Sequence, residues 1–242
     1  MSLRDRIATP AGKRAYVRTL FATIADRYDF ITVALSFGRD RRWKQRLLDL
    51  AAIAAGARVL DLATGTGDIA YAAAARRGRV VAVDITLRMI ELARAKQGQE
   101  GQETAPPARF VVADMLTLPF RAASFDIVTT GYGLRNVADL TLAIDEIRRV
   151  LAPGGALLSL DFNRPSNVVI RALYLGYLTV VGAALGWVLH RDPDTYRYIP
   201  ASIRQYPGAE EIARLLEARG FDRVAVYPVL GGLMTIHHAF RN

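Results

Sequence analysis

The chain of 242 residues is long enough for one α/β domain, and its 52% hydrophobic content excludes an intrinsically disordered protein. Cysteine is absent, which excludes a disulfide scaffold, a thiolate zinc site and a cysteine nucleophile. The net charge is +9, of which residues 1–46 supply +7, with eleven Lys or Arg against four Asp or Glu. A basic arm of this kind fits nucleic acid, an anionic membrane or an acidic partner.

Three further features of the composition narrow these choices. Only three of the 32 basic residues are lysines, an arginine bias that weakens the charge as a sign of nucleic-acid binding, and we expect no nucleic-acid partner. Only three histidines occur (His190, His237 and His238), so we expect no metal centre. The N-terminal residues lack the apolar core of a signal peptide, which predicts a cytoplasmic protein.

The order of elements predicts the fold. Residues 12–55 are expected to form a helical cap, broken near Ser36-Phe37-Gly38. Predicted strands then alternate with predicted helices: the strands are 58–63, 79–85, 109–115, 125–131 and 156–162, and the helices are 68–77, 86–97 and 138–151. A further helix is predicted at 209–219, and a surface loop at 97–108. Such alternation is typical of a parallel sheet with helices on both faces.

The last two predicted strands, 223–230 and 233–240, are separated only by Gly231-Gly232. So short a connection requires an antiparallel hairpin, because a parallel crossover needs about a dozen residues or more. We therefore predict a seven-stranded, mostly parallel α/β sheet with a C-terminal antiparallel hairpin, the Rossmann-like architecture of class I methyltransferases. Residues 1–242 are expected to form a single domain, with an apolar insert at about 168–200.

A glycine turn follows the first predicted strand, in Asp61-Leu62-Ala63-Thr64-Gly65-Thr66-Gly67. Gly65 and Gly67 let the backbone bend sharply and approach a ligand, although the turn also satisfies a loose dinucleotide-binding pattern. Asp61 distinguishes the two ligands, because a carboxylate there suits the ammonium of a methionine moiety and would repel a pyrophosphate. A turn-forming or helix-capping role for Asp61 is the competing interpretation.

Acidic residues also end the next two predicted strands. Asp84 is placed to accept hydrogen bonds from ribose hydroxyls, a feature that NAD-binding proteins share. Asp114 is expected to accept from an adenine amine, with Met115 packing on the ring, unless Asp114 merely ends its strand. Because ligands bind at the carboxyl ends of parallel strands, this set favours S-adenosylmethionine (SAM) as the cofactor.

Several motifs outside this core resemble the ubiquinone/menaquinone biosynthesis C-methyltransferases. They are Ala25-Asp26-Arg27-Tyr28-Asp29, Leu35-Ser36-Phe37-Gly38 with Arg42-Trp43-Lys44, Gly133-Leu134-Arg135-Asn136-Val137, residues 192–203 and the terminal run 232–237. The resemblance covers about residues 15–240. It implies SAM-dependent C-methylation of a prenylated hydroquinone, demethylmenaquinol above all, with a ubiquinone precursor not excluded.

The resemblance also places Thr66, Asp84, Asp114, Met115 and Gly131 on the family's SAM-contact positions. This chain departs from the family at two points. Thr64-Gly65-Thr66-Gly67 stands where the family usually has Gly-Gly-Thr-Gly, and Gly131 stands where it often has serine, which removes a side-chain contact. Neither change abolishes a backbone cradle.

Carbon methylation is helped by removing the proton of the neighbouring phenol, so a base or a cationic group is expected beside the methyl. Arg135 and Asn136 are the first candidates: a guanidinium lowers a phenol pKa or holds an activating water but is a poor proton acceptor. A structural salt bridge is the alternative for Arg135. His237 is the conventional base and Asp161 a further one, each with a structural alternative. Tyr28, Tyr196 and Tyr198 either line the substrate pocket or pack in the core.

Residues 172–189 form an uncharged stretch at the lower length limit for a membrane span. Because they lie between strands of one sheet, we reject a span and keep two interpretations: a buried helix pair over the active site, or an interfacial lid that contacts lipid. Arg39, Arg41, Arg42, Lys44 and Arg46 would then support a peripheral contact with an anionic membrane, unless they form a solvated helix face. The sequence leaves a homodimer open.

Three competing functions remain. A methyltransferase for another lipophilic phenol is the closest rival. An RNA methyltransferase is supported by charge alone, and the sequence after the fourth strand, Thr129-Thr130-Gly131-Tyr132, lacks an Asp/Asn-Pro-Pro-aromatic run. A non-catalytic SAM-fold protein is the third, and the intact Asp61 and glycine turn argue against it.

Overall fold

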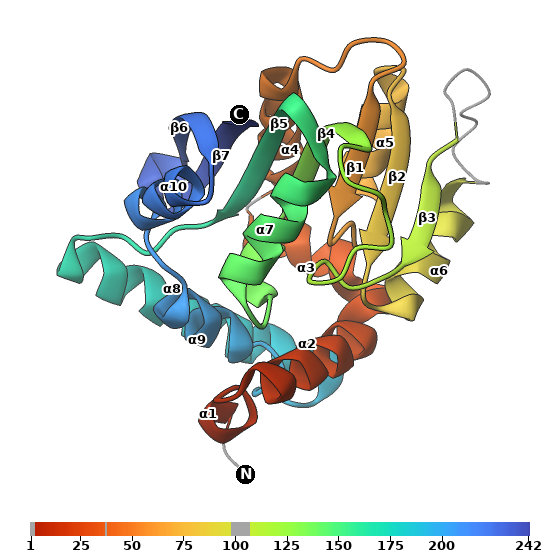
Figure 1. Ribbon diagram of the computed structural model, residues 1–242. Helices are drawn as coiled ribbons and strands as arrows, with labels where there is room; N and C mark the ends of the chain where they lie inside the picture. The colour runs from red at the N-terminus through yellow and green to blue at the C-terminus, as the bar shows by residue number, and fades with distance from the viewer. Residues whose placement is uncertain (1–2, 37, 98–106) are drawn as a thin grey trace.

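The computed structural model describes residues 3–36, 38–97 and 107–242. Seven strands form one sheet in the order β3-β2-β1-β4-β5-β7-β6 (Figure 1). Neighbours among β1 to β5 pair in parallel, whereas β7 lies antiparallel between β5 and β6. The strands are β1 (Arg58–Leu62), β2 (Arg79–Asp84), β3 (Arg109–Val112), β4 (Phe125–Gly131), β5 (Leu151–Phe162), β6 (Phe221–Val229) and β7 (Met234–Arg241). The predicted sheet and its antiparallel C-terminal hairpin are confirmed.

Helices cover both faces of the sheet because each carries one apolar side. On one face, α4 (Asp40–Ala51), α5 (Asp68–Ala75) and α6 (Leu87–Gln97) bury their apolar residues in a shared core. On the other, α7 (Leu140–Val150) and α10 (Ala209–Ala218) do the same. The predicted bounds of α5, α6, α7 and α10 are correct to within two residues, whereas α4 ends at Ala51 and not at 55.

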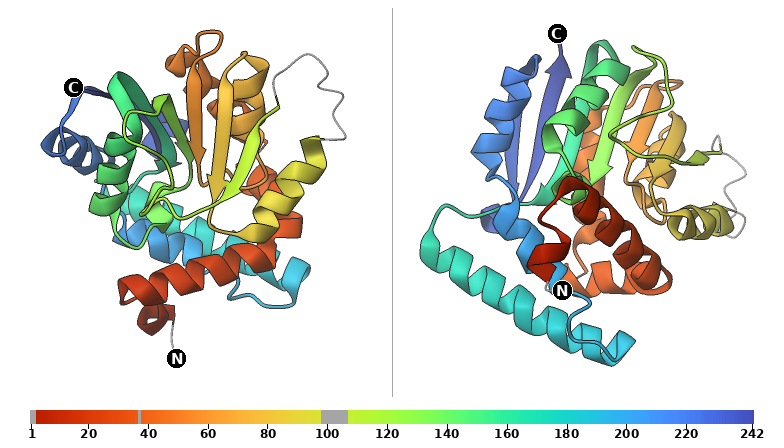
Figure 2. Two further views of the ribbon diagram at one scale, coloured as in Figure 1. Left: turned by 45° about the vertical axis from the view of Figure 1, so that its right-hand side comes forward. Right: turned by 60° about the horizontal axis from the view of Figure 1, so that its bottom comes forward.

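The remaining helices lie together beneath the carboxyl ends of the parallel strands, where all three views agree (Figures 1 and 2). They are α1 (Leu3–Arg6), α2 (Pro10–Ile24), α3 (Tyr28–Leu35), α8 (Val168–His190) and α9 (Tyr198–Gln205). Single 3₁₀ turns, η1 (Ala25–Arg27), η2 (Leu134–Asn136) and η3 (Leu230–Gly232), join neighbouring elements. The ligand-binding end of the sheet is thus roofed by two segments that are far apart in sequence.

Two strand boundaries differ from the prediction by three residues or more. Strand β5 begins at Leu151 rather than 156, because Leu151 already pairs with Phe125 before the register shifts at a bulge that includes Gly154 at φ +75°. Strand β3 ends at Val112, so Asp114 and Met115 follow the strand instead of ending it. Phe37 and most of the predicted loop at 97–108, namely 98–106, lie outside the described residues.

Residues Val168–His190 of the apolar insert form one continuous helix, α8, so the uncharged stretch 172–189 is a single helix and not a helix pair. Asn167 begins the helix by accepting hydrogen bonds from the backbone N–H groups of Val169 and Ile170. Two of its glycines make room for the returning chain: a Cβ at Gly182 would lie 3.2 Å from Tyr196 Cβ, and one at Gly186 would lie 2.5 Å from the Asp192 carbonyl oxygen.

Helix α8 is the one described helix that is long and apolar enough to cross a bilayer. It leaves β5 and returns through α9 and α10 to β6, and both strands pair with β7. A crossing would separate strands that are hydrogen-bonded in one sheet, so the structure is consistent only with a helix that stays on one side.

We predict opposite effects of alanine at two glycines of α8. Gly186→Ala should destabilise the fold by about 1–3 kcal/mol, because its Cβ collides with backbone at Asp192. Gly176→Ala should be neutral or stabilising by up to about 1 kcal/mol, since nothing lies within 4 Å of its Cβ and alanine favours a helix. Urea denaturation of both variants measures the difference, and equal free energies of unfolding would contradict this packing.

Candidate active site

The loops after β1 and β2 are joined by the carboxylate of Asp84. Its Oδ2 accepts a hydrogen bond from the Gly65 N–H at 2.9 Å, and its Oδ1 accepts one from the Thr86 N–H at 2.8 Å. Burial raises the pKa of Asp84 despite these donors. Gly65 and Gly67 adopt φ values of +56° and +93°, the left-handed region that favours glycine, so the turn depends on them.

Asp61 is buried directly beneath this turn, with 1% of its surface exposed. Its carboxylate accepts hydrogen bonds from the hydroxyls of Thr64 at 2.6 Å and Thr129 at 2.8 Å. Burial raises the pKa of Asp61 to about 7, although both hydroxyls oppose the shift. A positive charge nearby would stabilise the ionised form of this buried carboxylate, which fits the ammonium of SAM.

A cavity of about 80 Å³ opens above these loops. Of the predicted cofactor residues, it is lined by Gly65, Asp84, Asp114, Met115 and Gly131. Asp61, Thr66 and Gly67 are not at its wall: Thr64 covers Asp61, and the Thr66 hydroxyl donates to Asp29 Oδ1 of α3 at 2.5 Å.

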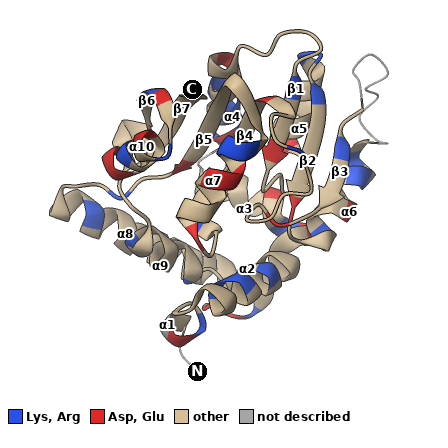
Figure 3. Ribbon diagram, in the orientation of Figure 1, with Lys and Arg blue, Asp and Glu red and all other residues tan. Residues whose placement is uncertain are grey.

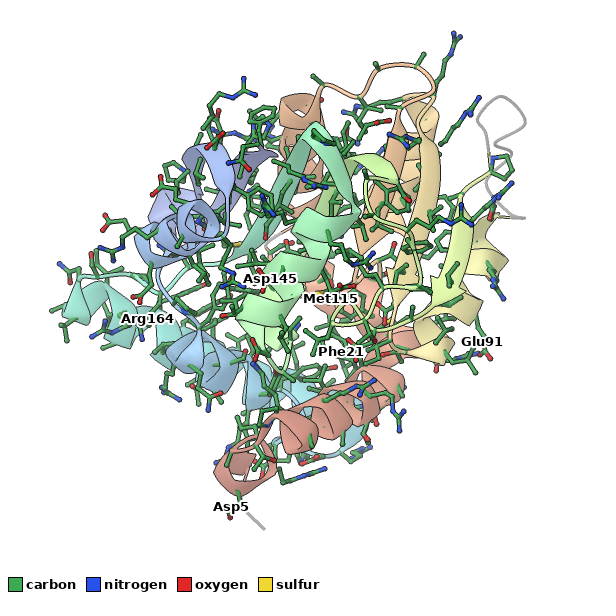
Figure 4. All side chains as sticks on the ribbon, in the orientation of Figure 1. Asp5, Phe21, Glu91, Met115, Asp145 and Arg164 are labelled. Atoms are coloured by element: carbon green, nitrogen blue, oxygen red, sulfur yellow. The ribbon has the colours of Figure 1, made fainter. Side chains whose placement is uncertain are left out.

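Helix α2 closes the same cavity from the opposite side, which the sequence did not predict. Val17 and Phe21 line it, and Arg14 Nε lies 2.7 Å from Asp114 Oδ2. Figure 4 labels Phe21 on α2 and Met115 in the loop after β3, and both residues line this cavity. Only weak amphipathic spacing marks α2, so nothing in the sequence indicated which core loop it would cover.

A second cavity of about 360 Å³ lies between the cap helices, α8 and residues 195–199. Its wall is almost entirely apolar, and Arg135 is its one charged residue among the part of the chain that the structure describes. Phe21, Tyr28 and Tyr132 line both cavities, so these three aromatic side chains form the boundary between them. Asn136 faces the smaller cavity and Arg135 the larger one.

Arg135 is held by a set of contacts that fixes its guanidinium. Its Nε lies 3.1 Å from Asp161 Oδ1, its Nη1 donates to Asn136 Oδ1 at 3.1 Å, and Cζ lies 4.7 Å above the Phe162 ring. The Arg135 N–H also donates to Asp161 Oδ2 at 3.2 Å. The ion pair is buried on both sides, which makes removal of one partner costly.

Asn136 and Asp161 hold other groups in place. Asn136 Nδ2 donates to the Tyr132 carbonyl at 2.7 Å while its Oδ1 serves Arg135. Asp161 accepts from the N–H groups of Arg135 and Phe162, and burial raises its pKa although Arg135 opposes the shift. Since Asp161 does not line either cavity, the structure makes it a positioning residue for Arg135 and not a base in contact with substrate.

His237, a candidate for the catalytic base, lies away from both cavities, which favours its structural alternative. His237 lies in mid-strand on β7, is buried, and pairs through Nε2 with the Ala209 carbonyl at 2.9 Å, on the α10 side of the sheet. It lines neither cavity, and its burial lowers its pKa. His190 pairs with the Tyr196 hydroxyl at 2.9 Å and His238 stacks on Phe240, so both of these histidines are structural too.

All three predicted pocket tyrosines line the larger cavity. Burial raises the pKa of Tyr28 to about 12, so it stays protonated at the wall between the cavities. Tyr196 is anchored through His190. The Tyr198 hydroxyl is buried and has no hydrogen-bond partner among the described residues, which makes it an unsatisfied polar group at an apolar wall.

The sequence profile of the ubiE/COQ5 methyltransferase family matches residues 10–241. The ubiquinone/menaquinone biosynthesis C-methyltransferase UbiE of Serratia proteamaculans is 36% identical over 232 residues, covering 95% of this chain and 92% of that protein. The demethylmenaquinone methyltransferase of Thermus thermophilus is 41% identical over 204 residues, covering 84% and 91%. The chain belongs to the ubiE/COQ5 methyltransferase family. It is a SAM-dependent C-methyltransferase.

Solved structures agree on the fold. A SAM-dependent methyltransferase from Thermotoga maritima superposes with a TM-score of 0.65 at 17% identity, covering 93% of this chain and all of that one. A SAM-dependent methyltransferase from Aquifex aeolicus gives 0.59, also at 17% identity, over 82% of this chain and 89% of that one. At this identity the likeness concerns the fold alone.

We predict that affinity for S-adenosylhomocysteine rises as the pH increases through about 7. Asp61 is protonated below its raised pKa, and its ionised form is the one that an ammonium stabilises, so binding strengthens as the proton leaves. The rise should level off above that pH, once Asp61 is fully ionised. Calorimetric titration measures the profile, and an unchanged rise in Asp61→Asn would remove Asp61 from this role.

Proposed function

We propose that this enzyme transfers the methyl group of SAM to a ring carbon of a prenylated hydroquinone in menaquinone or ubiquinone biosynthesis, with demethylmenaquinol giving menaquinol as the foremost reaction. The larger cavity carries the proposal. Its wall is apolar over most of its area and has one guanidinium, that of Arg135. A ring with a polar oxygen and an isoprenoid tail matches that distribution, whereas a charged or hydrophilic substrate would lose its hydration without compensation.

SAM, held by the strand-end loops, would supply an electrophilic methyl group on its sulfonium. The protein's part is then to bring the ring carbon in line and to favour the phenolate form of the substrate. Arg135 would do the latter by placing its fixed positive charge beside the ring oxygen, because Asp161 and Asn136 already orient the guanidinium. The aromatic boundary of Phe21, Tyr28 and Tyr132 would exclude water between the two ligands.

Tyr198 would donate a hydrogen bond to a substrate oxygen. Tyr198 lines the cavity, and its buried hydroxyl has no hydrogen-bond partner among the residues that the structure describes. Burial raises the pKa of this hydroxyl, so it donates and does not act as a base. Burying such a group is costly unless a ligand satisfies it. This gives the substrate pocket a recognition element besides Arg135.

We also propose that the enzyme works in the cytoplasm in peripheral contact with the inner membrane face, where prenylated quinones reside. The basic residues of the N-terminal cap contribute less to this membrane contact than the sequence indicates. Lys44 is buried between Asp40 at 2.5 Å and Asp68 at 2.9 Å, so it is not available to an anionic leaflet, whereas Arg39, Arg41 and Arg42 are exposed. A homodimer remains an alternative use of the exposed apolar surface.

A methyltransferase for another lipophilic phenol is the competing function, and complementation tests it. In a host that lacks the quinone C-methylation step, the wild-type gene should restore a quinone heavier by one methyl group. The double variant Arg135→Ala/Asp161→Asn should restore little, with methyl transfer by the purified protein reduced about 10²–10³-fold. The double change avoids leaving the Asp161 charge unpaired in the core.

Two measurements keep this test decisive. Melting temperature shows whether the double variant folds, and S-adenosylhomocysteine affinity should change little because Arg135 faces the larger cavity. Near-normal turnover in the folded variant would remove Arg135 from the mechanism. A wild-type enzyme that leaves the quinone unmethylated would favour another phenol as substrate.

For Tyr198→Phe we predict lower activity together with unchanged or higher stability. Loss of one hydrogen bond to substrate should reduce kcat/KM roughly threefold to tenfold. Removal of an unsatisfied buried hydroxyl should leave the free energy of unfolding unchanged or raise it. Tyr206→Phe is the matched control, since its buried hydroxyl also lacks a partner among the described residues but does not line the cavity. Equal activity losses in both variants would argue against substrate recognition by Tyr198.

A further inference from the structure

One side of α8 exposes a continuous apolar stripe. Val169, Leu173, Val180 and Trp187 follow one another at spacings of four, seven and seven residues, which places them on one helical face. Their exposed fractions are 68%, 71%, 70% and 57%. The opposite face packs against α9 through Tyr174, Leu175 and Leu178. Helix α8 is apolar on all sides but is buried on one side only. Its other side therefore exposes apolar surface to water, which is unfavourable.

This stripe runs into the mouth of the larger cavity. Ile170, Leu173 and Tyr177 line the cavity and are exposed at the same time, so the rim of the cavity belongs to the outer face of α8. From that rim inward, the described lining offers no charged group before Arg135. An apolar molecule can therefore pass from the exposed face of α8 to Arg135 without entering water.

Basic residues stand at both ends of the uncharged stretch, which Figure 3 displays as a long segment of α8 without charge. Arg164 and Arg171 lie at its beginning, and Arg191 ends the helix with its guanidinium 5.6 Å from the Trp187 ring. Two acids follow at this end: Asp192 accepts a hydrogen bond from the Thr195 hydroxyl, and Asp194 is paired with Arg197. A tryptophan beside an arginine at the end of an apolar helix is typical of a lipid–water interface, and the arginines suit anionic headgroups.

We propose that the outer face of α8 lies flat in the surface of a phospholipid bilayer and that the larger cavity opens sideways into the lipid. The route for the substrate rests on the proposed function, whereas the contact with lipid does not. A second copy of the chain is the competing occupant of this face. The cavity rim favours lipid, because a partner subunit seated on Leu173 and Tyr177 would cover the entrance.

Vesicle co-sedimentation tests the surface. The full-length protein should bind vesicles of phosphatidylcholine containing about one third phosphatidylglycerol, and salt should weaken the binding only in part, because apolar area contributes most. Val180→Gln/Trp187→Gln should reduce binding at least about tenfold. Leu142→Gln/Val226→Gln is the matched control: it removes two exposed apolar side chains on α7 and β6, and should bind as the wild type does.

The two tryptophans report where the contact lies. Trp187 is exposed on α8, whereas Trp43 of α4 is buried. Brominated lipids should quench the fluorescence of the wild-type protein, and Trp187→Phe should remove most of the quenching while vesicle binding persists, because phenylalanine is also apolar. Trp43 lines the larger cavity, so a small remainder is expected from lipid that enters it. Quenching that is undiminished in Trp187→Phe would place the contact elsewhere and overturn the proposal.

Activity assays separate this inference from the proposed function. In Val180→Gln/Trp187→Gln, methylation of a long-tailed hydroquinone embedded in vesicles should fall with binding, while methylation of a short-tailed, water-soluble hydroquinone should not change. Unaltered vesicle binding in this double variant would overturn the lipid contact. So would light scattering in which the wild-type protein is a dimer and the double variant is a monomer. A wild-type enzyme that binds vesicles but methylates neither hydroquinone would overturn the proposed function alone.

Discussion

Three lysine side chains hold the N-terminal helices to the strand ends, and both cavities depend on that attachment. Lys13 of α2 donates to the Arg135 carbonyl at 3.0 Å, Lys44 of α4 lies 2.9 Å from Asp68, and Lys96 of α6 lies 2.5 Å from Asp29 of α3. They are the only lysines in the chain. Two guanidinium groups add to the same attachment, because Arg14 of α2 pairs with Asp114 and Arg88 of α6 pairs with Asp26.

The strand-end half of the site was predictable because its signals are local. A buried strand, an acid and a glycine turn follow one another within a few residues, so Asp84, Gly65 and Gly131 were assigned to one edge of the sheet before any packing was known. The other half was not, because α2 reaches that edge from another part of the chain. Arg14 therefore meets Asp114 across a distance in sequence that no local pattern records.

Burial patterns explain two assignments that the sequence left open. His237 has the right chemistry for a base, but it lies in mid-strand, two residues from Thr235, the register partner of Asp161. It shares a face of the sheet with Asp161 but lies further from the carboxyl end of β5, where its Nε2 pairs with the Ala209 carbonyl of α10. For α8, an apolar composition on every side predicts a helix but not its orientation, so a buried pair and a surface helix were equally compatible with the residues. The close contacts at Gly182 and Gly186 determine which side faces inward.

The aromatic boundary of Phe21, Tyr28 and Tyr132 has a thermodynamic consequence. Because the same three rings touch both cavities, a movement that adapts the boundary to one ligand also changes the space offered to the other. Such coupling is reciprocal: if the first ligand tightens binding of the second, the second tightens binding of the first by the same factor. Tyr28 also belongs to the cap, so the order in which the ligands enter becomes linked to how firmly the cap is closed.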